Sequence, residues 1–162
     1  MKTIPLTQGK HAVVDDEDYV YLSQFKWYAD KSANTYYAKR RVRLIRGGSQ
    51  GTVNMHHAIL GKPIRGMVVD HINRNGLDNR RINLRVVTNH VNLLNAGMFR
   101  HNTSGYKGAF YHKKGKRWYA QIRVNGKKIA VWSFDNPKDA AAAYNKLVEE
   151  YREPFFYKNP LD

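Results

Sequence analysis

The chain has 162 residues, a formal net charge of +15 and a hydrophobic content of 42%, which supports packed cores and excludes a disordered basic tail. It has no cysteine, which excludes disulfides and thiolate metal sites, and no apolar run approaches the roughly 20 residues of a membrane span. The N-terminus lacks the apolar core of a signal peptide. We therefore expect a cytoplasmic protein of one domain or two small ones that does not bind membranes.

Residues 1 to about 66 show short strand patterns that glycine-containing turns separate. The predicted strands and turns are Lys2–Leu6, His11–Val14, Thr35–Val42 and Gly51–Asn54, with turns at Gly9-Lys10 and Gly47-Gly48. The acidic residues Asp15–Asp18 precede Tyr19, Leu22 and Phe25, which have helical spacing. We interpret the four acids as a helix N-terminus, favoured by the helix dipole, in preference to a metal site.

The second block, residues 66–96, has the pattern of a strand, a long loop, a strand and a helix. Met67–Val69 is a short buried strand, and the polar loop Asn73–Asn79 follows it. Leu84–Val87 is the second strand, and Thr88 is a suitable N-cap for a helix that includes Val91, Leu94 and Asn95.

The third block begins near Ser104, after a segment without clear periodicity. Its predicted elements are strands over Tyr106–Tyr111, Trp118–Val124 and Lys128–Phe134, an Asn125-Gly126 hairpin turn, and a helix from Asn136 to about Tyr151. Strand alternation directs Trp118, Ala120, Ile122 and Val124 toward the helix, together with Ile129 and Val131. The tail is expected to fold back through Phe155 and Phe156.

Basic residues dominate the centre of the chain. The 56 residues between Asp78 and Asp135 contain twelve Lys and Arg and no acid, with Tyr106, Tyr111, Trp118 and Tyr119 interleaved. A polyanion favours charge of one sign, because each Lys or Arg that neutralises a phosphate also releases a counterion. The pattern predicts nucleic acid as the partner.

Three residues of the second block suit a divalent cation. Asp70 and His71 end an apolar strand, and Asn92 lies on the first turn of the following helix. A carboxylate, an amide oxygen and an imidazole fit one Mg²⁺ or Mn²⁺ that keeps several waters, whereas structural zinc requires four closed ligands.

The stretch MHHAILGKPIRGMVVDHINRNGLDNRRINLRVVTNHVNLLN resembles the HNH motif of phage and intron-encoded homing endonucleases. The resemblance implies a ββα-metal fold and hydrolysis of DNA phosphodiester bonds. His71 would be the general base, Asp70 and Asn92 would hold one divalent ion, and Asn83 would brace the loop and orient His71. His56 would contact a phosphate or support the structure. Asn92 replaces the usual final His, and neighbours Asp70 and His71 can act together only if the strand ends there and the chain twists.

The stretch SGYKGAFYHKKGKRWYAQIRVNGKKIAVWSFDNPKDAAAAYN resembles the DNA-binding domain of plant ethylene-response factors, the APETALA type. That resemblance implies a three-stranded sheet in the DNA major groove, with Arg123 reading guanine and Gln121 reading adenine. The usual Arg positions hold Lys107, Phe110 and His112, so the family's base preference does not transfer. The residues expected to contact DNA are Arg80, Arg81, Lys107, Phe110, His112, Lys114, Tyr119, Gln121, Arg123 and Lys128.

The expected fold is α+β: a β-rich N-terminal region with the ββα-metal motif at about 66–96, then a three-stranded antiparallel sheet packed on one helix. Residues 1–97 would form the nuclease, 98–103 a linker and 104–162 the DNA-binding domain. The expected activity is site-preferring cleavage of double-stranded DNA, without a small-molecule substrate, by a monomer or alternatively a dimer. The alternatives are a DNA-binding regulator with a degenerate nuclease site and an RNA-binding protein.

Overall fold

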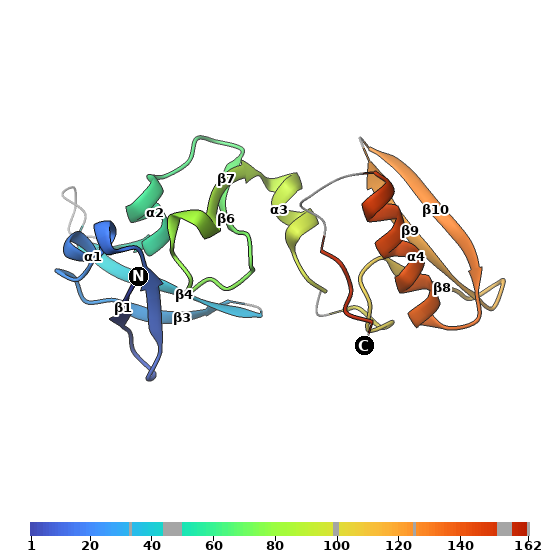
Figure 1. Cartoon of the computed structure of the whole chain (residues 1–162), viewed down its shortest axis with the longest axis horizontal. Helices are drawn as coiled ribbons and strands as arrows, with labels where there is room; N and C mark the ends of the chain where they lie inside the picture. Colours follow the sequence, from blue (N-terminus) through green and yellow to red (C-terminus); the bar gives the residue numbers. More distant parts are fainter. Residues whose placement is uncertain (33, 44–49, 99–100, 125, 152–156, 162) are drawn as a thin grey trace. The chain divides into compact units, whose positions relative to one another are not determined.

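The computed structural model describes all residues except 33, 44–49, 99–100, 125, 152–156 and 162. The chain divides into two compact units, Met1–Leu93 and Leu94–Asp162. Both are of mixed α+β composition and are built from small antiparallel sheets with short helices (Figure 1). Within the described part of the chain, no helix has the length and apolar character needed to cross a membrane.

The first unit begins with a hairpin and a three-stranded sheet. Its elements up to residue 60 are β1 (Lys2–Pro5), β2 (His11–Val14), α1 (Asp16–Leu22), β3 (Tyr28–Ser32), β4 (Thr35–Arg43), β5 (Gln50–Asn54) and α2 (Met55–Leu60). The sheet order is β3-β4-β5, and β1 pairs with β2 separately. The predicted strands are confirmed, whereas β3 and α2 were not predicted from the sequence. The predicted Gly47-Gly48 turn lies outside the described residues.

The core of this unit joins elements that are distant in the sequence. Its buried residues come from β1, β2, α1, β4, α2 and the segment before β3, and are Ile4, Ala12, Val14, Leu22, Trp27, Ala38 and Met55. The Trp27 indole Nε1–H donates to the Leu22 carbonyl at 2.8 Å, so its buried polar atom is paired. This core anchors β4 and α2, which carry two of the aromatic rings of the candidate site.

The acidic cluster forms the start of α1, as predicted. Asp15 is the N-cap, and Asp16, Glu17 and Asp18 lie in the first turn. Negative charge in this position is stabilised by the helix dipole.

The predicted strand, loop, strand and helix are all present. They are β6 (Met67–His71), a loop with the 3₁₀ turn η1 (Arg81–Asn83), β7 (Leu84–Thr88) and α3 (Asn89–Asn95). Strands β6 and β7 are antiparallel, with Asp70 opposite Arg85 and His71 opposite Leu84. Thr88 Oγ1 accepts from the Val91 N–H at 3.3 Å, which confirms the predicted cap.

The loop between β6 and β7 is attached to β2. The Val13 N–H donates to the Leu77 carbonyl, and the Asn79 N–H donates to the Val13 carbonyl, each at 2.8 Å. A third bond joins the Gly76 N–H to Thr35 Oγ1 at 3.0 Å. The long polar loop is therefore held by two backbone bonds to β2 and by one bond to the Thr35 side chain at the start of β4.

The second unit is a three-stranded antiparallel sheet with one helix on it (Figure 1). Strands β8 (Ala109–His112), β9 (Arg117–Val124) and β10 (Lys127–Phe134) have the order β10-β9-β8, and α4 spans Pro137–Glu150. Asn136 caps α4 by accepting from the Asp139 N–H at 2.9 Å. The hairpin residue Asn125 lies outside the described residues, while Gly126 has the positive φ, +78°, that such a turn requires.

Strand alternation places the core of this unit where it was predicted. Ala120 and Ile122 are buried against Tyr144, Leu147 and Val148, with Val124 and Ile129 packed on them. Trp118 packs on the second cluster, which Ala109, Ala140 and Ala141 form. Val131 lies opposite Ala120 but stays 38% exposed, because β10 is an edge strand.

The C-terminal tail packs on the second unit through Asn159. Its side chain accepts from the Lys107 N–H at 2.7 Å and donates to the Lys107 carbonyl at 2.9 Å. The side chain of Asn145 accepts from the Asn159 N–H at 2.9 Å. Phe155 and Phe156, through which the tail was expected to fold back, lie outside the described residues.

Candidate active site

Asp70 and His71 are both buried at the end of a strand. Their exposed fractions are 5% and 4%, although successive residues of a regular strand face opposite sides. Strand β6 ends at His71, and the next residues form a turn in which the Arg74 N–H donates to the His71 carbonyl at 2.8 Å. The end of the strand, one of the two conditions for a joint role of these residues, is therefore present.

Two aromatic rings, those of His56 and Tyr37, pack against His71. The ring centroids of His56 and His71 are 5.2 Å apart, and those of Tyr37 lie 5.7 Å from His71 and 5.8 Å from His56. The His56–His71 and Tyr37–His56 pairs are close to perpendicular. Edge-to-face rings at these separations attract one another, so His71 has a fixed ring plane.

Asn79 is the hydrogen-bond partner of the His71 ring. Asn79 is fully buried, and its Oδ1 lies 3.3 Å from His71 Nε2. Its Nδ2 donates to the Gly76 carbonyl at 3.5 Å, which turns Oδ1 toward the imidazole. Because Oδ1 can only accept, Nε2 carries the proton and Nδ1 is the basic nitrogen.

The environment keeps both buried imidazoles neutral. Burial lowers the pKa of His71, although the Asn79 hydrogen bond and the charges of Asp70 and Asp78 partly oppose this effect. Burial, followed by the neighbouring His71, His57 and Lys39, lowers the pKa of His56 to about 3. A neutral His71 can accept a proton, whereas a neutral His56 cannot offer charge to a phosphate.

Asn83 braces the loop between the two strands. Its Nδ2 donates to the Asp78 carbonyl at 2.7 Å, and its Oδ1 accepts from the Asn73 N–H at 2.9 Å. Its own carbonyl accepts from the Ile72 N–H at 2.9 Å. Asn83 thus joins both ends of the loop, while Asn79 bonds the imidazole itself.

Asp70 pairs with the arginine opposite it on β7. Both Nε and Nη2 of Arg85 donate to Asp70 Oδ2, at 2.8 and 2.6 Å. A carboxylate has about four lone-pair sites on two oxygens, so a carboxylate can in general accept from an arginine and bind a cation at the same time. Asn92, the second expected ligand, lies on α3 and is half-buried. In the part of the chain that the structure describes, no three His, Cys, Asp or Glu side chains form a metal-binding group.

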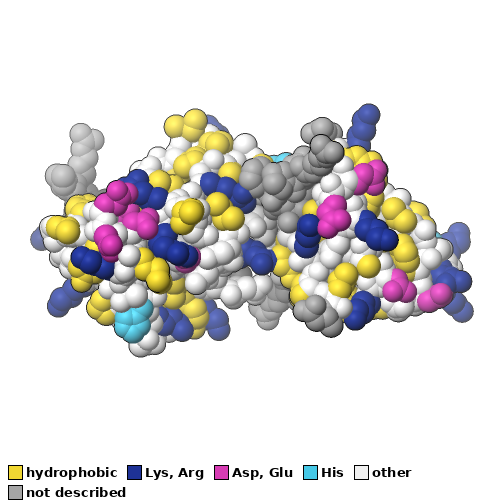
Figure 2. Space-filling view, in the orientation of Figure 1, with side chains coloured by type: hydrophobic (Ala, Val, Ile, Leu, Met, Phe, Trp, Pro, Cys, Tyr) yellow, Lys and Arg dark blue, Asp and Glu magenta, His cyan; other side chains and the backbone are white. Residues whose placement is uncertain are grey.

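The basic run is partly neutralised, which corrects the expectation of one-signed charge. Arg80 pairs with Asp78, Arg81 with Glu17 and Asp18, Arg85 with Asp70, and Arg117 with Asp135. Arg80 and Arg81, both expected to contact DNA, are thus engaged by acids of the first unit. The face in Figure 2 shows basic and acidic side chains intermixed. Among the described basic residues of the run, Lys113, Lys114, Lys116, Arg123, Lys127 and Lys128 have no carboxylate within ion-pair distance.

Most of the expected DNA-contacting residues of the second unit share the sheet face opposite α4. On this face Phe110, Tyr119 and Trp132 form one row across the strands, Gln121 lies beside Ala130, and Arg123 lies beside Lys128. His112 lies beyond the aromatic row, and Lys114 is exposed in the following turn. Lys107 does not belong to this face, because β8 begins only at Ala109. Its Nζ donates to the carbonyls of Leu94 and Ala96 at 2.8 and 2.5 Å.

Comparison with known proteins shows what a segment of the first unit and the chain as a whole are similar to. Residues 60–94, which contain β6, the loop, β7 and most of α3, match the family model described as HNH endonuclease. A protein of Acanthamoeba polyphaga mimivirus named "Uncharacterized HNH endonuclease L560" is 26% identical over 160 residues, which cover 96% of this chain and 78% of that protein. No solved structure matches the chain. The family match ends before residue 104, so the ethylene-response-factor resemblance stays a prediction.

Sequence reasoning missed two residues that surround His71. Asn79 belongs to the DNRR segment that carried the HNH resemblance, so a signal was present, although it pointed to Asn83 as the orienting residue. Tyr37 had no signal, because it lies on β4, far from His71 in the sequence, and only the packing of β4 on the loop brings the rings together.

Proposed function

We propose that the chain is a divalent-metal-dependent DNA endonuclease of the HNH type that cleaves phosphodiester bonds at a preferred site. The observation that carries the proposal is the buried, neutral His71, which Asn79 orients within the segment similar to HNH endonucleases. A buried imidazole with one nitrogen bonded to an amide oxygen and the other basic is suited to general-base catalysis.

His71 deprotonates the attacking water through Nδ1. Asn79 holds the proton on Nε2, so the imidazole presents its lone pair in one direction. His56 and Tyr37 are supporting residues that keep the ring plane fixed. The lowered pKa of His56 favours this structural role over the alternative of a charged phosphate contact.

Asp70 and Asn92 are the residues that would hold Mg²⁺ or Mn²⁺. A carboxylate and an amide oxygen are hard donors, and such ions are commonly bound by one or two carboxylates with waters and substrate phosphate completing the shell. The bound ion would stabilise negative charge on the scissile phosphate and on the leaving 3′-oxygen. Asp70 adds to the negative potential at His71, which favours the uptake of a proton by the imidazole.

The second unit serves as the DNA reader in this proposal. Its open sheet face combines the exposed Arg123 and Lys128 with the half-exposed Gln121, and exposed lysines follow in the turn after β8. Arg and Gln on a regular strand can reach base edges, whereas the lysines of a turn contact phosphates. The division of labour resembles that of a site-preferring nuclease of a mobile element.

The test is plasmid cleavage in the presence of Mg²⁺ or Mn²⁺. We expect His71→Ala to lose about 10²–10⁴-fold in rate while it binds DNA within a few fold of the unchanged chain. His11→Ala is the matched control, because His11 is exposed on β2 and makes no part of the proposed site. Full cleavage by the His71 variant would overturn the assignment of the base.

A DNA-binding regulator without nuclease activity is the second candidate. The observation that favours it is the Arg85 guanidinium on Asp70, because a cation is already paired with the carboxylate that would bind the metal. Absence of nicking by the unchanged chain with either ion, together with retained binding to duplex DNA, would support this candidate.

A further inference from the structure

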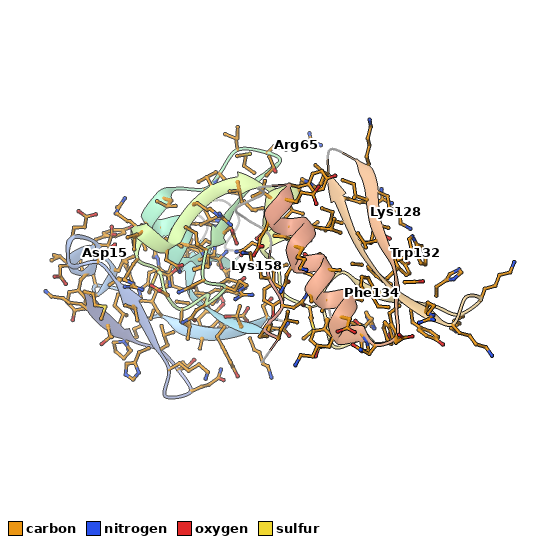
Figure 3. All side chains as sticks on the ribbon, turned by 45° about the vertical axis from the view of Figure 1, so that its right-hand side comes forward. Asp15, Arg65, Lys128, Trp132, Phe134 and Lys158 are labelled. Atoms are coloured by element: carbon orange, nitrogen blue, oxygen red, sulfur yellow. The ribbon has the colours of Figure 1, made fainter. Side chains whose placement is uncertain are left out.

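An aromatic row crosses the open face of the C-terminal sheet. Phe110 on β8, Tyr119 on β9 and Trp132 on β10 are direct neighbours in the register of the three strands. Phe110 and Trp132 are 43% and 50% exposed, which is unusual for large apolar side chains on a folded sheet. The adjacent residues Ala109 and Ala120 are buried on the helix side, so the row lies on the opposite face. Figure 3 shows Trp132 and Lys128 on the side of the sheet away from α4.

The rings cover one another's faces. Tyr119 and Trp132 are stacked with centroids 4.0 Å apart at 21°, and Phe110 and Tyr119 are stacked at 5.4 Å and 28°. Tyr119 lies between its two neighbours, so neither of its faces is open to a nucleic acid base. The ring of His112 meets Trp132 edge-on at 5.3 Å. The central ring of the row is therefore covered by its neighbours, unlike the open ring faces on which proteins stack unpaired bases.

Charged and polar groups surround the aromatic row. Lys128 Nζ lies 5.4 Å from the Tyr119 ring centroid, and Arg123 lies opposite Lys128 at one end of the face. The lysines of the 113–116 turn follow the other end. Positive charge on both sides of an apolar ridge complements a double helix, whose phosphates flank grooves that contain the base edges.

We propose that the Phe110–Tyr119–Trp132 row reads thymine methyl groups in the major groove of double-stranded DNA. The 5-methyl of thymine is the apolar group that unmodified base pairs present in this groove, and apolar side chains recognise it by contact. Arg123 and Gln121, on the same face, supply the hydrogen bonds for neighbouring purines. The inference rests on the proposed role of the second unit as the DNA reader.

The test is the replacement of thymine by deoxyuracil, which removes only the methyl group. Preferred duplexes are selected with the full chain in the presence of a chelator, so that no cleavage occurs, and each thymine is then replaced singly. We expect at least one position at which deoxyuracil weakens binding about fourfold, the value of one buried methyl group. This loss should disappear in Trp132→Ala and in Phe110→Ala, since the ridge that senses the methyl is then incomplete.

Val131→Ala is the matched control, because Val131 lies on the same strand with its side chain on the other face. Val131→Ala should retain the full deoxyuracil effect. A thermal melt shows whether each variant is folded. If Trp132→Ala is not folded, Phe110→Ala decides the test alone. The proposal is overturned if no thymine is sensitive, if the selection gives no preferred sequence, if the effect persists in the row variants, or if single-stranded DNA competes as well as duplex. A chain that cuts plasmid without any deoxyuracil effect loses only this inference, whereas one that shows the effect without cutting loses only the nuclease.

Discussion

Gly76 is the position at which a single added carbon should disturb the site most directly. A Cβ built on Gly76 would lie 2.5 Å from the Tyr36 carbonyl oxygen and 2.7 Å from two ring atoms of Tyr37. The backbone oxygen cannot move away cheaply, because Tyr36 is held in the β3–β4 ladder. The Tyr37 ring can move only by disturbing its contacts with His56 and His71.

Gly76→Ala should therefore reduce both stability and catalysis. Overpacking of this kind costs about 1–3 kcal/mol, and the displaced ring should lower the cleavage rate more than DNA affinity. Gly97→Ala is the control, because a Cβ at Gly97 meets no atom within 4 Å; it should change the unfolding free energy by less than about 0.5 kcal/mol. Urea unfolding and single-turnover plasmid cleavage measure the two effects.

The reasoning would be refuted if Gly76→Ala were as stable and as active as Gly97→Ala. If Gly76→Ala were destabilised but cut DNA at the unchanged rate, the Tyr37 ring would be part of the core without being a support for His71.

Three further predictions concern pH, the metal ligands and the sheet face. The folded pKa of His56 lies near 3, well below the unfolded value of 6.5. The free energy of unfolding is therefore fully present above pH 6.5 and falls as the pH is lowered, by at most about 1.4 kcal/mol per pH unit from this group. His56→Gln should flatten this slope in urea unfolding measured from pH 7 to 5. Asp70→Asn should abolish cleavage and also lower the free energy of unfolding by about 3 kcal/mol, since it leaves the Arg85 charge without its carboxylate. Asn92→Ala should impair cleavage without that loss of stability. Equal destabilisation by both variants would count against the distinction. Arg123→Ala and Gln121→Ala should each relax the preference for a contacted base by about 1–3 kcal/mol. Lys114→Ala should instead weaken binding to all sequences and lower the salt dependence of the binding constant by about one ion. Footprints at two salt concentrations separate these outcomes.

Local patterns in the sequence were sufficient for most of the secondary structure. The strand, loop, strand and helix around Asp70 and His71 follow from apolar runs, a polar loop and the Thr88 cap, and the structure contains each of them. The two faces of the C-terminal sheet follow from alternation, because a strand has a fixed side-chain period of two. Strand β3 and helix α2 escaped prediction, since neither has a strong periodic signal and the capping residues Asn54 and Gly61 enclose a helix of only six residues.

The surroundings of the candidate base and the balance of charge were decided by tertiary structure. Asp15 and Asp18 lie 66 and 63 residues from Arg81, yet they bond its backbone N–H and its guanidinium. Tyr37 reaches His71 only because β4 packs beside the loop that Gly76 belongs to. A sequence pattern reports the neighbours of a residue along the chain, whereas burial, pKa and ion pairing depend on neighbours in space. For that reason the sequence could point to His71, but only the fold shows that its ring is buried, neutral and bonded to Asn79.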